Sequence, residues 1–307
     1  MNKRVYGVIG ISSIMANWNA DFSGYPKTTT DNMTFGSDKA LKYTMKKLWD
    51  EAGQQVLYIK SFRMDPKNGI VPRTLRERYE YIFNVEDLTK EKDQGEVLKK
   101  LFQAVDVKNF GATFAEAKNN LSITGAVQFG QGFNLYEGTE PQEQNILSPF
   151  KDSKKEDAKN STLGTKIVSN EAHYFYPFVI NPLAYKEYEA MGVTEGYTED
   201  DYAGFKKAAL VGATAYASNS KEGCENEFGL FIETEADCYL PNLSDYIRFS
   251  KGKDGEKNKI SLNCGALLTQ MGAQIQNTEV YYNPYTTELS MDLPKVKYFN
   301  IITMEEV

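Results

Sequence analysis

The sequence predicts an α+β protein with a ferredoxin-like core, in which an antiparallel sheet is backed by helices. Two observations carry this prediction. Near the start of the chain, a β-branched strand, an amphipathic helix and a second strand follow one another, and the same β-α-β pattern recurs in the second half. Large insertions, rather than short turns, separate the two units.

The first unit begins with a strand over 4–14, in which β-branched residues alternate with others. A helix over 38–52 follows and ends at Gly53, the residue type favoured just after a helix. Residues 55–62 read as the second strand. The loop between the first strand and the helix is longer than a connection requires, and long ordered loops are usually functional.

The insertion between the units mixes several elements. A turn over 65–69 precedes helices over 73–83 and 94–105. Residues 121–130 alternate between apolar and polar side chains, which predicts a single strand. The polar stretch 137–170 then predicts a protruding excursion from the body of the protein.

The second unit begins with an apolar strand over 172–181. The helix over 198–217 has the most regular apolar stripe in the chain, and Thr198 is well placed to cap it. A strand over 227–237 follows. Residues 278–291 read as a hairpin that turns at an Asn-Pro pair.

Composition is typical of a soluble globular protein, with 41% hydrophobic and 25% charged residues among 307. No apolar run is long enough to span a membrane, so we expect a cytoplasmic protein. The three cysteines are not spaced as metal ligands or a disulfide framework, and we expect no metal and no cofactor.

The charge is unevenly distributed along the chain. The net charge of −7 argues against a nucleic-acid partner when taken alone. However, residues 27–78 contain 11 Lys or Arg against 6 Asp or Glu, whereas residues 171–250 contain 14 acids against 5 bases. This asymmetry would give one polyanion-binding face on an acidic body.

The helix over 38–52 carries lysines beside its apolar stripe. The stripe consists of Leu41, Met45, Leu48, Trp49 and Ala52. Lys39, Lys42 and Lys46 lie within a narrow arc on a different face, and Ser37 occupies the N-cap position. One interpretation is a capped, solvated surface helix. The other is a phosphate site at the helix start, approached through Gly36 and neutralised by Lys39 and Lys42.

Two further sets of residues, one of arginines and one of glycines, can likewise be interpreted either as ordinary structural features or as ligand contacts. Arg73 and Arg76 fall on one face of the helix over 73–83, near Arg63, and are either plain surface charges or nucleic-acid contacts. In "QFGQGFN", Gly130 and Gly132 either mark a strand end or let a ligand approach the backbone.

Catalytic arrangements are sparse. The single histidine, His173, lies in an apolar strand and reads as a satisfied core residue. Asp21 and Asp31 lie in the loop after the first strand, where an aspartate is usually a turn residue. No nucleotide-binding or metal-ligand motif occurs.

Several segments together resemble the Cas7 family of the RAMP superfamily, the repeated backbone subunit of type I CRISPR Cascade complexes, most closely its type I-B branch. They include "FGSDKALKYTMKKLW", "FGATFAEAKNNLSITGAVQFGQGFN" and "TLGTKIVSNEAHYFYPFVINP". The second of these is the most specific, whereas "GSDK" in the first is shared with the wider superfamily. They occur in the family's order over nearly the whole chain. The loop "NWNADFSGYP" departs from the run found in many type I-B relatives.

The resemblance implies a hand-shaped molecule. A modified RNA-recognition-motif palm would comprise 1–62, 107–136 and 171–307, a helical finger insertion 63–106, and a β-hairpin thumb 137–170. Copies would oligomerise helically along a guide RNA (crRNA), with other Cascade subunits, and present the guide for base pairing with target DNA in antiviral defence. The resemblance implies RNA binding rather than enzyme activity.

Mapped onto this chain, the family's RNA contacts fall on Lys27, Ser37, Lys39, Lys42, Lys46, Arg63, Arg73, Arg76, Gln128 and Gln131. Two alternatives stay open. A RAMP endoribonuclease would cleave target RNA with Asp21 or Asp31, as type III relatives do. An oligomeric scaffold would bind no RNA.

Overall fold

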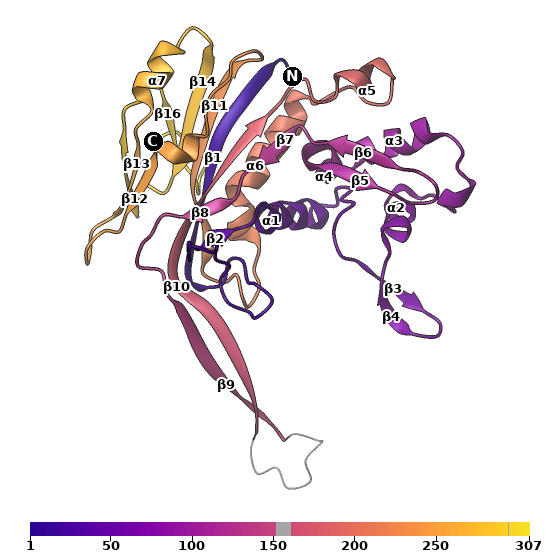
Figure 1. Ribbon diagram of the computed structural model, residues 1–307, viewed down its shortest axis with the longest axis horizontal. Coiled ribbons are helices and arrows are strands. Elements are labelled where there is room, and N and C mark those ends of the chain that lie inside the picture. Colours follow the sequence, from indigo (N-terminus) through magenta and orange to yellow (C-terminus); the bar gives the residue numbers. More distant parts are fainter. Residues whose placement is uncertain (152–160, 294) are drawn as a thin grey trace.

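A nine-stranded sheet forms the centre of the protein (Figure 1). Its strands are β1 Lys3–Ala16, β2 Phe35–Gly36, β7 Val127–Phe129, β8 Gly132–Asn134, β9 Pro141–Lys151, β10 Ser161–Ile180, β11 Cys224–Glu235, β14 Ile275–Tyr282 and β16 Lys297–Asn300. They follow the order β16-β14-β11-β1-β10-β8-β2, and β7 and β9 also pair with β10. The computed structural model describes residues 1–151, 161–293 and 295–307.

The predicted strand over 4–14 is confirmed as β1, which is buried on both faces. Val5 and Ile9 belong to one hydrophobic cluster, whereas Tyr6 belongs to another. Because successive side chains of a strand point to opposite faces, the sheet separates two cores. β10 and β11 flank β1, and both run antiparallel to it.

Two helices, α1 Asp38–Glu51 and α6 Glu199–Ala215, cover one face of the sheet and pack against each other. Both were predicted. The Thr198 hydroxyl accepts a hydrogen bond from the Asp201 N–H, and the Asp201 carboxylate accepts one from the Thr198 N–H, which closes the N-terminus of α6. At Gly212 a Cβ would lie 3.3 Å from the Met45 backbone nitrogen, so the absence of a side chain permits the close packing of the helices.

A second, smaller sheet covers the other face. It consists of β12 Ile247–Ser250, β13 Asn258–Leu262 and β15 Thr287–Met291, accompanied by α7 Gly265–Gln270 and the 3₁₀ turn η2 Leu243–Tyr246. The predicted hairpin over 278–291 is therefore wrong, because β14 and β15 belong to different sheets. Both edges of β14 are already paired, with β11 and with β16, so β15 pairs in parallel with the free edge of β13.

The remaining elements form a body beside the end of α1 (Figure 1). They are β3 Phe62–Asp65, β4 Gly69–Pro72, α2 Leu75–Phe83, η1 Leu88–Lys90, α3 Gln94–Gln103, α4 Val105–Phe110, β5 Gly111–Phe114 and β6 Leu121–Thr124, and α5 Lys186–Ala190 lies nearby. The predicted turn over 65–69 is the loop of the β3–β4 hairpin. Within the described chain, no helix combines the length and apolar character needed to cross a membrane.

Residues 121–130 form two strands instead of the one predicted. The chain leaves β6, which pairs with β5, and enters β7, which pairs with β10. At the change of sheet, the Ala126 N–H donates to the Tyr185 hydroxyl at 3.0 Å. A Cβ on Gly125 would lie 2.2 Å from the Phe110 carbonyl carbon, so only glycine fits at this crossing.

The predicted strand over 55–62 is also wrong, and with it the first β-α-β unit. Only Phe62 of this stretch belongs to a strand, β3. The backbone N–H groups of Leu57 and Tyr58 instead donate to the two carboxylate oxygens of Asp106, each at 2.8 Å. A buried side chain thus supplies the acceptors that a neighbouring strand would otherwise provide.

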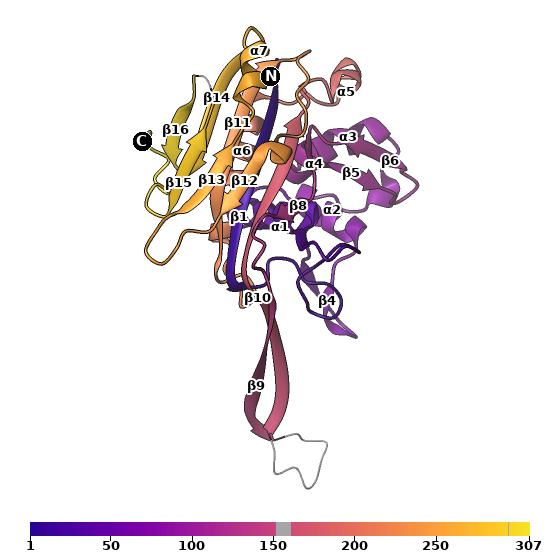
Figure 2. The same cartoon turned by 60° about the vertical axis from the view of Figure 1, so that its left-hand side comes forward.

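A long hairpin of β9 and β10 projects from the body, as Figures 1 and 2 show from two directions. β10 continues from this projection into the centre of the sheet, where it pairs with β1. The polar excursion predicted over 137–170 corresponds to this hairpin and its approach. Residues 152–160 of that prediction lie outside the described residues.

Candidate nucleic-acid interface

Two glycine-containing segments that lie far apart in the sequence meet at β2 and β8. Phe35 pairs with Phe133, and Gly36 pairs with Gly132. β2 leads directly into α1, and β8 follows directly on Gln131. The pairing therefore brings the start of α1 beside the predicted contact segment "QFGQGFN".

These glycines are required by packing. A Cβ on Gly36 would lie 1.8 Å from the Tyr176 hydroxyl oxygen, and one on Gly132 would lie 2.4 Å from the Tyr176 ring. A Cβ on Gly130 would lie 2.8 Å from Pro177. The structure thus accounts for all three by the side chains of Tyr176 and Pro177 on β10, without a ligand.

The start of α1 is held by the preceding loop. Ser37 occupies the N-cap position, but its side chain makes no capping hydrogen bond, so the predicted cap is wrong in this detail. The Asn19 side-chain oxygen accepts the Ser37 N–H at 2.8 Å, and the Asn19 carbonyl accepts the Lys27 N–H at 2.9 Å. Asn19 was not singled out by the sequence, because one asparagine in an Asn-rich loop carries no periodic signal.

The three lysines predicted on one arc of α1 have different surroundings. Lys39 is exposed and has no ion-pair partner among the described residues. The Lys42 ammonium lies 3.0 Å from the Asp38 carboxylate, which partly neutralises it. Lys46 is directed inward, 3.6 Å from the buried Asp106, and burial lowers its pKa despite the opposing charge of Asp106. Of these lysines, Lys39 is the most available to a solvent-borne anion.

The three predicted arginines belong to the body around β3 and α2. Arg63 lies 2.9 Å from both Asp65 and Glu77. Arg76 lies 3.8 Å from Glu80 on the exposed side of α2. Arg73 precedes α2 instead of sharing a helical face with Arg76, because Thr74 caps the helix; its guanidinium lies 4.1 Å from the Tyr81 ring centroid.

Of the two predicted glutamines, Gln128 lies within β7 and Gln131 lies on the connection between β7 and β8. Both are exposed. The Gln128 side-chain amide donates to the Gly125 carbonyl at 2.8 Å, which leaves its oxygen toward solvent-accessible space. Gln131 precedes Gly132, which pairs with Gly36. Through this strand pairing, Gln131 lies nearer to the start of α1 than Gln128 does.

Asp21 and Asp31, the aspartates of the alternative cleavage hypothesis, are both exposed. The Asp21 carboxylate accepts the backbone N–H groups of Ser23 and Tyr25, at 2.8 and 3.0 Å, and so closes a turn. Within the described ranges, no group of three or more His, Cys, Asp or Glu side chains is arranged to hold a metal ion.

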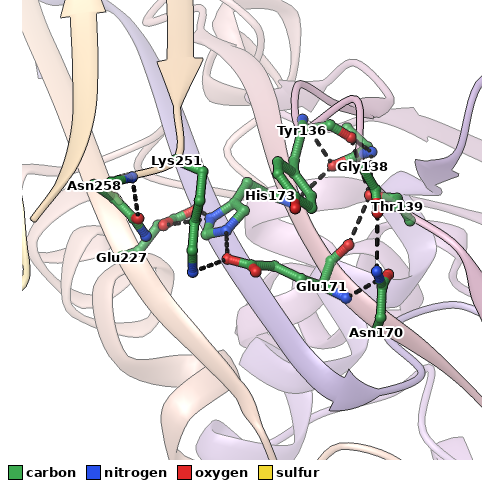
Figure 3. A network of polar contacts seen from close by, with 11 residues as sticks. Tyr136, Gly138, Thr139, Asn170, Glu171, His173, Glu227, Lys251 and Asn258 are labelled. Carbon is green, nitrogen blue, oxygen red and sulfur yellow. Dashed lines mark hydrogen bonds and ion pairs between the residues drawn. The ribbon is translucent and has the colours of Figure 1, made fainter. Parts of the chain in front are cut away.

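The root of the projecting hairpin contains a buried ionic cluster, drawn in Figure 3. His173 is 1% exposed; its Nδ1 lies 2.8 Å from Glu227 and its Nε2 lies 3.0 Å from Glu171. Lys251 approaches Glu171 at 2.6 Å, and Phe249 stacks on the imidazole at 3.8 Å between ring centroids. The cluster joins β10 to β11 and β12. The prediction of His173 as a satisfied core residue is confirmed.

These charges determine the ionisation of the imidazole. Burial alone would lower the pKa of His173, but the negative charge of Glu227 and the hydrogen bonds to Glu227 and Glu171 outweigh it and raise the pKa. Burial likewise opposes ionisation of Glu171, yet its hydrogen bonds with His173 and Lys251 lower its pKa. A protonated imidazole donating to both carboxylates is the favoured state.

Comparison with known proteins now identifies the family. A family model described as CRISPR-associated protein Cas7 matches residues 3–263. The chain belongs to the Cas7 family. The match covers the predicted interface, including the start of α1, the segment around β8 and the whole β9–β10 hairpin.

One solved structure, titled "CRISPR RNA-guided surveillance complex, pre-nicking", resembles this Cas7-family chain in fold and aligns with a TM-score of 0.56 and 16% identity over 98% of each chain. A second, titled "CRISPR RNA-guided surveillance complex", aligns with a TM-score of 0.48 and 15% identity over 94% of each chain. No curated protein matches the sequence.

Proposed function

We propose that this chain is a subunit of a CRISPR RNA-guided surveillance complex and binds the backbone of the guide RNA. The observation that carries the proposal is the pairing of Gly36 with Gly132, which brings the first turn of α1 beside the β7–β8 connection. Lys39 and Gln131 are both exposed there. A helix start, an exposed cation and an amide side chain together form the proposed phosphate site.

The chemistry of this site favours phosphate without reading sequence. Backbone N–H groups at a helix start donate to anions, and the helix dipole adds partial positive charge. The exposed ammonium of Lys39 supplies a full positive charge. The side chains of Ser37 and Gln131 can each donate and accept hydrogen bonds. Contacts of this kind position a nucleic-acid strand but leave its bases free to pair.

The finer architecture is part of the same proposal. The central sheet with α1 and α6 would be the RNA-recognition-like palm, the body around α2 and α3 the finger, and the β9–β10 hairpin the thumb. Copies would stack helically along the guide in the cytoplasm, with other subunits, and target DNA would pair with the guide. The proposal contains no catalytic step.

Co-expression with a guide RNA and the partner subunits tests this function. We expect RNA-bound particles that contain several copies of the chain. Affinity for RNA should fall steeply with salt and should be independent of sequence, because phosphate contacts release counterions. Recovery of only an RNA-free monomer under these conditions would refute the proposal.

A matched pair of variants tests the site itself. Lys39→Glu should reduce the yield of bound RNA, because it reverses the charge at the start of α1. Lys47→Glu is the control, since Lys47 lies on the same helix but pairs with Glu51 at 3.1 Å. Equal RNA yields from both variants would support the scaffold alternative instead.

A further inference from the structure

The outer face of the β3–β4 hairpin is apolar and uncovered. Phe62 pairs with Pro72 and Met64 pairs with Ile70, so these four side chains share one face. The exposed fractions of Phe62, Met64 and Ile70 are 51%, 75% and 71%. Exposure of three large apolar side chains side by side differs from the single apolar residues scattered over an ordinary surface.

The opposite face of the hairpin is fastened to the protein. Arg63 points to that side and lies 2.9 Å from Glu77 on α2 and from Asp65 on its own strand. An isolated two-stranded hairpin is only marginally stable, so this attachment is what holds the structure in place. The apolar face is therefore presented outward from a supported base.

Cations surround the apolar face. Lys60, Lys67 and Arg73 have no ion-pair partner within the described residues, whereas Arg63 between them is doubly paired. The Lys60 ammonium lies 5.0 Å from the Phe62 ring centroid. Arg73 lies over the ring of Tyr81, which is 58% exposed, and donates to the Phe62 carbonyl. Two cations without an ion-pair partner among the described residues thus lie beside exposed aromatic rings, Lys60 at Phe62 and Arg73 at Tyr81.

We propose that this surface, Phe62, Met64 and Ile70 with Lys60, Lys67 and Arg73, binds unpaired bases of single-stranded RNA. Bases stack on exposed aromatic side chains, and apolar wedges of Phe, Met and Ile insert between base steps. The surrounding cations would hold the adjoining phosphates. The uncompensated charge of these cations is complementary to RNA phosphates, which makes single-stranded RNA the proposed occupant.

The position of the hairpin agrees with this assignment. The Lys46 ammonium lies 3.5 Å from the Tyr58 carbonyl, so the segment that leads to β3 starts against α1. The β3–β4 and β9–β10 hairpins project toward the same side of the molecule (Figures 1 and 2). The inference rests on the proposed function, and adds a base-contacting element to a site that otherwise holds only phosphates.

Photochemical cross-linking of the full-length chain to a thiouridine-containing single-stranded RNA tests the proposal. We expect cross-links on the peptide that spans β3 and β4. A deoxyribose strand of the same sequence is the second arm. Cross-links to the DNA strand but not to RNA, or cross-links to RNA only at other peptides, would overturn the assignment.

Salt titrations of RNA binding separate stacking from charge. Phe62→Ala should weaken binding about tenfold without changing the slope of log affinity against log salt. Lys67→Ala should reduce that slope by about 0.7, the value for one phosphate contact on a single strand. Tyr285→Ala is the control for the first variant, because Tyr285 is a 76% exposed aromatic residue in the turn between β14 and β15.

The outcomes distinguish this inference from the proposed function. If the wild-type chain binds no RNA, both fail. If it binds RNA and Phe62→Ala binds as tightly, only the hairpin assignment fails. A Phe62→Ala variant that changes the oligomeric state in light scattering, with unchanged RNA affinity, would assign the face to a protein partner and would also overturn the proposal.

Discussion

Two buried ionic clusters support the regions proposed to meet RNA, and they are built differently. Beneath α1, the fully buried carboxylate of Asp106 accepts two backbone N–H groups and faces Lys46. At the root of the β9–β10 hairpin, His173 lies between Glu171 and Glu227. In the first cluster one acid is held by two backbone donors and Lys46, whereas in the second two acids flank one imidazole and Lys251 lies beside Glu171.

The difference teaches where pH can act on this protein. Backbone N–H groups cannot be deprotonated near neutrality, so the Asp106 cluster keeps its donors throughout the physiological range. The His173 cluster depends on one proton, because a neutral imidazole can donate to only one of its two carboxylates. The backbone hydrogen bonds to Asp106 are therefore independent of pH near neutrality, whereas the hydrogen bonds at the hairpin root depend on the protonation of His173.

The largest effect on folding should come from Asp106→Ala. This change leaves the N–H groups of Leu57 and Tyr58 without acceptors and Lys46 without its counter-ion, which should lower the free energy of unfolding by about 3 kcal/mol. Urea denaturation measures it. Asp31→Ala, at an exposed loop position, is the control and should stay within about 0.5 kcal/mol of the wild type.

The equivalent change in the other cluster is His173→Ala, with an expected loss of about 2 kcal/mol at neutral pH. Two half-buried carboxylates are then left facing each other with only Lys251 to neutralise them. Glu227→Gln in the same background should restore part of the loss, because it removes one of the like charges. A further loss on adding Glu227→Gln would mean that the carboxylates do not repel.

Lys46→Met should cost less, about 1 kcal/mol. The methionine keeps the apolar stem that packs beside the rings of Tyr58 and Phe110, and Asp106 keeps both backbone donors. The same denaturation assay applies. Lys47→Met on the same helix removes only a surface pair with Glu51 and should have almost no effect; equal losses from both variants would argue against a supporting role for Lys46.

The smallest effect is a pH dependence. The pKa of His173 is raised above its ordinary value of 6.5, so its contribution to stability is fully present below about pH 6.5 and is lost as pH rises through the folded-state pKa. Unfolding free energies measured across this range should decline in the wild type and not in His173→Gln. NMR titration can follow the residue directly, because the chain has one histidine.

The spacing of apolar residues in the sequence correctly predicted the helices and strands that bury one regular face or whose contacts are local. β1, α1, α6 and the C-terminal half of β10 were all found near their predicted bounds. The failures involve distant partners. Residues 55–62 look like a strand because Val56 and Leu57 are buried, but their backbone is satisfied by Asp106, about fifty residues away.

The candidate site was predictable only in part, for the same reason. The sequence placed Lys39, Lys42 and Lys46 on one arc but could not tell that Lys46 serves a buried carboxylate while Lys39 remains exposed. It picked out both glycine segments but not their pairing at Gly36 and Gly132. That pairing depends on Tyr176 of β10, which fits beneath both glycines and which no short-range pattern connects to them.

The length of β10 has a mechanical consequence. Its 20 residues form one continuous strand, roughly 65 Å when extended, that reaches from the projection to the middle of the nine-stranded sheet. One unbroken backbone therefore joins the outer hairpin, where β10 pairs with β9, to the central sheet, where it pairs with β1. We expect a displacement of the outer hairpin to reach β1 through His173, which pairs with Ser12 of β1.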